Sequence, residues 1–129
     1  MKKYLLFGFI LILTGCEAPD PEARRAALHL PPPGFIGNPV QGSGLYVSNC
    51  SSCHGNNGRG TEQGPPLIDQ VYRPAHHADF AVHMAVRDGV RQHHWGYGDM
   101  PAVPHITPEE TAHIIAYIRQ EQSKAGITN

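Results

Sequence analysis

The side chains best suited to chemistry in this sequence of 129 residues lie within five positions of one another. Cys50 and Cys53 are separated by two serines, and His54 follows directly. Cys-x-x-Cys-His is the pattern at which a c-type haem is attached. The two thiols bond the two vinyl groups on one porphyrin edge, and the histidine then lies under the iron and supplies an imidazole nitrogen. The pattern therefore predicts one covalently bound haem c.

Two other kinds of site use a Cys-x-x-Cys pair, and the sequence favours neither. A thioredoxin-like redox centre expects a β-α-β setting, whereas no segment here alternates apolar and polar residues in the manner of a strand. A structural zinc site expects a second pair of cysteines or histidines at a set spacing. No second Cys-x-x-Cys is present, so haem attachment remains the preferred interpretation.

The N-terminus has the pattern of an export signal. Lys2 and Lys3 precede an almost wholly apolar run over residues 4–13, which is shorter than the roughly 20 residues of a spanning helix but fits a signal peptide. The run ends in Leu-Thr-Gly-Cys16, which resembles a bacterial lipobox. We expect residues 1–15 to be removed and Cys16 to be lipidated, so that the protein is anchored to a membrane. An ordinary signal peptide with an incidental cysteine is the alternative.

Cysteine usage and charge agree with this assignment. With Cys16 lipidated and the other two cysteines bound to haem, no thiol is left for a disulfide. Removal of the signal peptide leaves eight basic against eleven acidic side chains, and no basic stripe is available to bind nucleic acid. Glu17, rather than an aspartate, follows Cys16. This favours a periplasm-facing protein on the outer rather than the inner membrane of a bacterial envelope.

The rest of the chain predicts an all-α domain behind a tether. Five prolines within residues 16–38 favour an extended, lipid-anchored tether, with a turn or two of helix over residues 24–30. We expect the domain over residues 39–125 and a tail over residues 126–129. Within the domain we expect three helices, over residues 39–50, over residues 79–88 with Asp79 as N-cap, and from Thr107 to the residue before Gly126. Thr107, Pro108 and Glu110 form a capping-box pattern. Three helices make a thin core, which a large apolar cofactor would complete.

The order of short motifs over residues 39–125 resembles class I cytochrome c. These motifs are Gly-Leu-Tyr at 44–46, the Cys-x-x-Cys-His segment at 50–54, Gly-Pro-Pro-Leu at 64–67, Gly-Asp-Met-Pro at 98–101 and a last helix that contains Tyr117. The resemblance implies a small all-α fold in which three main helices and loops wrap one haem. It also implies that the first and last helices cross, with Gly42 or Gly44 and Tyr46 meeting the last helix near Ile114 and Tyr117.

The resemblance further implies a set of haem contacts. Met100 would be the sixth iron ligand opposite His54, and the Pro65 carbonyl would accept a hydrogen bond from His54. Met84 is the competing methionine, but it lies inside a predicted helix. The other expected contacts are Leu67 on the haem face, Trp95 and Tyr97 in the cleft with polar atoms for a propionate, and Arg59 as a further propionate partner.

Nine histidines are the unusual feature of the composition. Most could be polar surface residues. His93 or His94 could instead replace Met100 as the axial ligand. A third interpretation is a second metal site, for example for copper, formed by His76, His77, His93 and His94, because imidazoles on loops are good ligands for copper and zinc.

These features together predict a single-electron carrier and not an enzyme. Electrons would pass through the haem edge near Cys50 and Cys53 to redox partner proteins that dock weakly. Two alternatives remain open. One is a haem-based sensor or small redox enzyme with a labile sixth ligand, and the other is a histidine-rich copper-binding or assembly protein.

Overall fold

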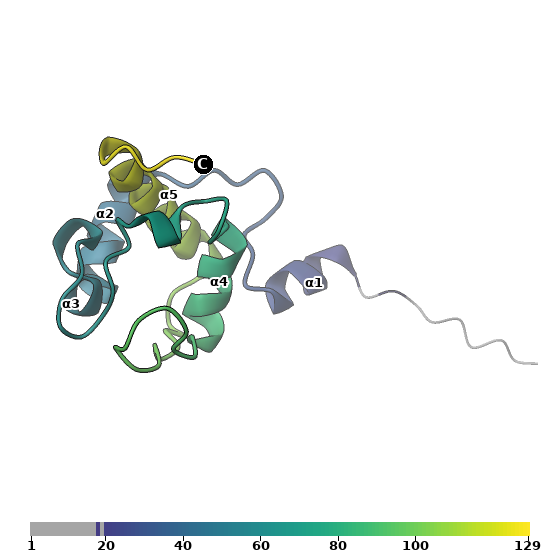
Figure 1. Ribbon diagram of the computed structural model, residues 1–129. Coiled ribbons are helices and arrows are strands. Elements are labelled where there is room, and N and C mark those ends of the chain that lie inside the picture. The colour runs from purple at the N-terminus through teal and green to yellow at the C-terminus, as the bar shows by residue number, and fades with distance from the viewer. Residues whose placement is uncertain (1–17, 19) are drawn as a thin grey trace, which may run out of the picture.

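The computed structural model of the chain describes residues 18 and 20–129 (Figure 1). The predicted signal peptide and Cys16 lie outside the described residues. The elements are α1 (Pro21–Ala27), α2 (Pro39–Asn49), α3 (Ser51–His54), α4 (Asp79–Asp88) and α5 (Pro108–Lys124), with 3₁₀ turns at Asn56–Gly58 and Gln70–Tyr72. Within residues 20–129 no strand forms, and one isolated bridge joins Val90 to Met100. The predicted all-α fold is confirmed.

No helix in the described part of the chain is long and apolar enough to cross a membrane.

Local capping sets where the main helices begin. Asn38 caps α2 by accepting hydrogen bonds from the backbone N–H groups of the first turn, and Pro39 occupies the first helical position. At α5, Thr107 Oγ1 accepts from the Glu110 N–H at 3.2 Å, and Glu110 Oε2 accepts from the Thr107 N–H at 2.9 Å. The predicted capping box is therefore present.

The start of α4 differs from the prediction. Asp79 was expected to cap this helix, but it is the first helical residue, and Ala78 occupies the cap position without a side-chain hydrogen bond. The Asp79 carboxylate instead pairs with Arg119 Nε on α5 at 2.9 Å. An interaction between two helices thus replaces the local cap. The C-terminal end of α4 agrees with the prediction. Gly89 follows the last helical residue and has a positive φ of +75°.

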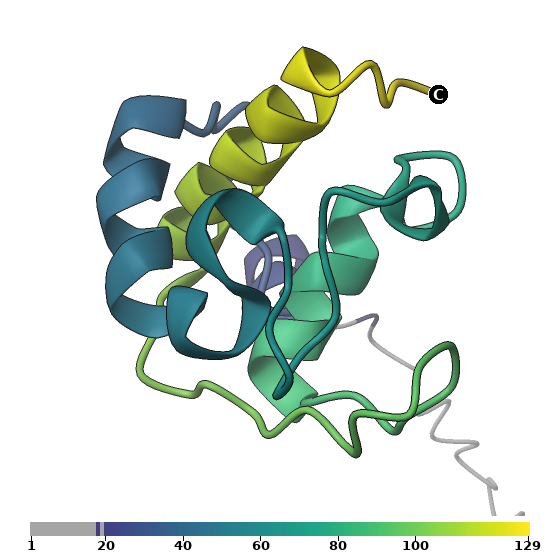
Figure 2. The same ribbon diagram turned by 60° about the vertical axis from the view of Figure 1, so that its left-hand side comes forward.

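The fold depends on the crossing of α2 and α5, which lie side by side in Figure 2. A Cβ atom on Gly42 would lie 1.8 Å from the His113 carbonyl oxygen, so only glycine permits this approach. The rings of Tyr46 and Tyr117 pack with centroids 5.2 Å apart. A Cβ atom on Gly44 would have no atom within 4 Å. Of the two predicted glycines, only Gly42 therefore lies at the crossing. The core around it consists of Tyr46, Val86, Ile106, Ile114, Tyr117 and Ile118.

The segment before α2 lies against the domain. The helix predicted over residues 24–30 begins earlier, at Pro21, because Asp20 accepts a hydrogen bond from the Ala23 N–H. Further along, His29 Nε2 lies 3.0 Å from Thr111 Oγ1 on α5, and the Asn38 N–H donates to His113 Nδ1 at 2.7 Å. The part of the predicted tether nearest the domain is thus attached to α5 at both ends.

The two glycines of α2 provide a test of the crossing. We expect Gly42→Ala to lower the free energy of unfolding by about 3 kcal/mol, because the new Cβ must displace the backbone of α5. Gly44→Ala meets no atom and should stabilise α2 by about 0.5–1 kcal/mol through its better helix propensity. Urea unfolding of the haem-loaded ferric protein, followed by circular dichroism, measures both. Equal midpoints for the two variants would contradict this account of the crossing.

Candidate functional site

A cavity of about 590 Å³ lies at the centre of the domain. Its walls come from the α2–α3 junction, the loop after α3, α4, the loop before α5, and α5 itself. Most of the wall is apolar, and its aliphatic members include Leu67, Ala81, Val82, Ala85, Val86, Val90, Ile114 and Ile118. A volume of this size with a few polar groups is typical of a site for a large apolar ligand.

Cys50 is one of the residues that line this cavity. Cys50 ends α2 and Cys53 lies one turn on, in α3. Both are free thiols and both are half-buried. Burial raises the pKa of the Cys50 thiol to about 11, with a smaller contribution from Cys53. The Cys50 thiol is therefore neutral near pH 7, and both sulfur atoms remain free to form thioether bonds.

His54 is oriented by one backbone carbonyl. Its Nδ1 lies 2.9 Å from the Pro65 carbonyl oxygen, which can only accept, so Nδ1 carries the proton. The lone pair is then on Nε2. Histidines that bind a metal through one ring nitrogen usually donate the N–H of the other to a carbonyl or carboxylate, as His54 does here. Burial lowers the pKa of His54, which favours the neutral form that a metal requires.

The loop that follows His54 is held by two tyrosines. Tyr46 is fully buried, and its hydroxyl donates to the Gly55 carbonyl at 2.9 Å. Tyr117 donates to Asn57 Oδ1 at 2.9 Å. The sequence predicted both tyrosines only as contacts between helices. In the structure they also fix the loop that follows His54.

Met100 reaches the cavity from the loop before α5. It is half-buried and lines the same cavity as His54. Its N–H and carbonyl each hydrogen bond to Val90 at 2.9 Å, and a Cβ on Gly89 would lie 2.4 Å from the Met100 carbonyl oxygen. Met84 is not among the residues that line the cavity. His54 and Met100 therefore line one cavity, and Met84 does not.

The other predicted contacts divide into two groups. Leu67, Trp95 and Tyr97 line the cavity, and Trp95 Nε1 is buried without a hydrogen-bond partner among the described residues. A buried N–H of this kind needs an acceptor, and a haem propionate would supply one. Arg59 is exposed and does not line the cavity, so the structure does not place it for the propionate contact that the sequence suggested.

Two polar residues of α5 that the sequence analysis missed support the cavity wall. Gln122 is buried, and its side-chain amide donates to the carbonyls of Leu67 and Tyr72 at 2.8 and 3.0 Å. Arg119 also donates to the Tyr72 carbonyl, at 2.9 Å. The sequence did indicate that Gln122 is buried, because it follows Ile114 and Ile118 at helical spacing on the apolar face of α5.

The histidines separate into those on the cavity and those elsewhere. His76, His77, His93 and His94 all line the cavity. His83 is buried beside His29, with ring centroids 6.1 Å apart. His105 lies 2.9 Å from the Asn49 side chain, and His113 accepts from Asn38. Hydrogen bonds to other elements therefore account for His105 and His113, whereas the buried Nδ1 of His83 has no partner among the described residues. The four histidines on the cavity remain unexplained.

The residues present fit a covalently bound haem. Cys50 and Cys53 would hold it by thioether bonds, His54 would supply one axial nitrogen, and the aliphatic walls would enclose the porphyrin. The unpartnered N–H of Trp95 offers a polar contact to a propionate in this mostly apolar cavity. A bound haem would supply one-electron chemistry between ferrous and ferric iron.

Covalent attachment can be tested directly. Protein matured with a haem-attachment system should carry the mass of one haem that resists acid extraction. We expect Cys50→Ala combined with Cys53→Ala to abolish this added mass, since both thioether bonds are lost, while Ser51→Ala should retain it. Intact-protein mass spectrometry distinguishes the variants. Retention of covalent haem by the double cysteine variant would contradict attachment at this pair.

The comparisons with known proteins agree with this geometry. The model of the Cytochrome c family matches residues 39–122, which is well over half of the chain and includes α2 to α4 and most of α5. Comparisons with curated proteins and with solved structures gave no match. The chain belongs to the cytochrome c family, and its covalently bound haem serves electron transfer.

Proposed function

We propose that this protein is a single-electron carrier whose one haem c has His54 and Met100 as its axial ligands. The observation that carries the proposal is the shared cavity. His54 reaches it from α3 and Met100 from the loop before α5. Each is held by backbone hydrogen bonds, His54 through Pro65 and Met100 through Val90.

The nature of the two ligands supports a carrier. An imidazole and a thioether suit both oxidation states of iron, and the thioether raises the reduction potential relative to a second histidine. Because both ligands belong to the protein and both are held in place, the surroundings of the iron need to change little when an electron is gained or lost. A labile sixth position, as in a haem sensor or a small redox enzyme, would lack this advantage.

The route for electrons would be the haem edge at Cys50 and Cys53. Both cysteines are half-buried, and the serines around them include the exposed Ser52. A partner could approach this edge closely. We infer that redox proteins dock here through small, short-lived contacts, and that the protein itself turns over no substrate.

The cellular setting follows from the sequence before the domain. We propose that Cys16 is lipidated and that the domain faces the periplasm, with the outer membrane favoured. Residues 20–27, which contain α1, would then lie between the lipid and the part of the chain that contacts α5. Such an anchor would keep the carrier near membrane-bound donors and acceptors.

The sixth ligand is tested by optical spectroscopy of the haem-loaded protein. Oxidised wild-type protein should show a weak far-red sulfur-to-iron band, and the reduced protein should not bind carbon monoxide. Met100→Ala should lose the band and bind carbon monoxide, because the sixth position is then open.

Met84→Ala is the matched control, since this methionine does not line the cavity, and its spectrum should be that of the wild type. The proposed ligation would be contradicted if wild-type protein readily bound carbon monoxide, or if the far-red band survived in Met100→Ala.

A further inference from the structure

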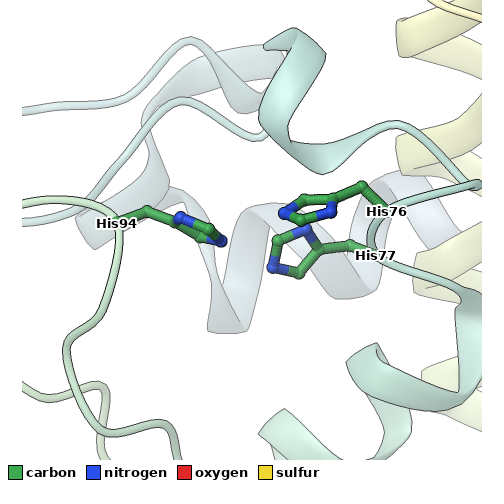
Figure 3. A group of neighbouring side chains, drawn as sticks. All are labelled: His76, His77 and His94. Carbon is green, nitrogen blue, oxygen red and sulfur yellow. The ribbon is translucent and has the colours of Figure 1, made fainter.

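Three histidines from two separate loops meet at the edge of the haem cavity (Figure 3). His76 and His77 follow the 3₁₀ turn at Gln70–Tyr72, and His94 lies in the loop that leads to Met100. One ring nitrogen from each of the three lies within 4.8 Å of those of the other two. Figure 3 shows the ring of His94 directed toward the other two rings. A zinc–imidazole bond is about 2.0–2.1 Å long, so nitrogens bound to one ion lie at most ~4.2 Å apart. At most a small movement of the rings would bring all three nitrogens to one ion.

The ring of His77 is already oriented as a ligand. Its Nδ1 lies 2.7 Å from the Val71 carbonyl oxygen and therefore carries the proton, which leaves the lone pair on Nε2. Most metal-binding histidines likewise donate their second ring N–H to a carbonyl, a carboxylate or water. The same arrangement holds His54 against Pro65.

The loop that carries His76 and His77 is fastened to α5. Arg119 donates to the backbone carbonyls of Tyr72 and His77. It also pairs with Asp79 at the start of α4. This side of the cluster therefore rests on two helices and does not depend on loop contacts alone.

The loop that carries His94 is closed by its own hydrogen bonds. Gln92 Oε1 accepts from the Gly98 N–H at 2.6 Å, and the Gln92 N–H donates to Asp99 Oδ1 at 2.9 Å. Val90 and Met100 pair at its base. His94 is thus presented by the same closed loop that presents Met100.

The rings of the cluster are accessible and are not paired with carboxylates. Among the residues described, none of His76, His77, His93 and His94 forms an ion pair. His76 and His94 are exposed, so an ion can reach them from solvent.

We propose that His76, His77 and His94 form a binding site for a divalent transition-metal ion, separate from the iron and with three imidazole nitrogens as its protein ligands. Imidazoles suit copper, zinc and nickel, and copper(II) should bind most tightly of these. A water molecule would complete the coordination. His93 packs on His94 with ring centroids 4.2 Å apart, but its Nδ1 lies 2.9 Å from the Arg91 carbonyl, and the site does not require it.

The test uses haem-loaded ferric protein at neutral pH in a non-chelating buffer. Zinc(II), which undergoes no redox reaction with the haem, is titrated by calorimetry and should bind with one ion per chain. We expect His94→Ala and His77→Ala each to weaken binding by more than ~10-fold, since each removes one of three ligands. Electron paramagnetic resonance of one equivalent of copper(II) should show nitrogen couplings that the same variants lose.

His105→Ala is the matched control, because this exposed histidine contacts Asn49 and does not line the cavity. It should bind zinc(II) as the wild type does. The haem spectra of both variants are recorded beside the titrations, because His77 and His94 line the haem cavity. Loss of zinc(II) binding with an unchanged haem spectrum then reports on the metal site alone. The proposal is overturned if wild-type protein binds no zinc(II), or if His94→Ala and His105→Ala bind it equally well. Neither outcome depends on whether Met100 is the sixth iron ligand.

Discussion

The approach of the Gly42 backbone to the His113 carbonyl constrains the whole domain. No other residue type fits at this position, because a Cβ would lie 1.8 Å from that oxygen. The close approach also places Tyr46 against Tyr117, and the Tyr46 hydroxyl then reaches the Gly55 carbonyl. Because α3 follows α2 almost at once, the crossing fixes Cys50, Cys53 and His54 relative to the wall that α5 provides.

Side chains of α5 help to hold one of the loops around the cavity. Within residues 20–129 only one isolated bridge pairs loop backbones in the manner of a sheet. Backbone polar groups in a partly buried loop still need partners, and α5 supplies them through Gln122 and Arg119. The last helix therefore has two roles. Its apolar side chains pack against α2 and the cavity, and its polar side chains fasten the loop that closes it.

Met100 and one member of the histidine cluster, His94, share one loop. Met100 and His94 both belong to the segment between α4 and α5, which is closed at its base by the pairing of Val90 with Met100. His77 belongs to the opposite loop, fastened to α5 by Arg119. An ion held between His94 and His77 would thus join the Met100 loop to the rest of the domain. Any such coupling would act through the position of this loop and not through direct contact with the iron.

The sequence by itself determined the features that depend only on residues close together along the chain. The haem-attachment pattern at residues 50–54, the capping box of α5 and the end of α4 at Gly89 all follow from residues at most a few positions apart. The expected cap at Asp79 failed because Arg119, distant in sequence, binds its carboxylate.

Only the tertiary structure decided which long-range partners meet. It selected Gly42 over Gly44 at the crossing, placed Met100 and not Met84 on the cavity, and brought His94 to His76 and His77. The physical reason is that a helix or a turn is set by local hydrogen bonds, whereas these meetings depend on the path of long loops. That path is fixed by close packing and by buried hydrogen bonds between residues far apart along the chain.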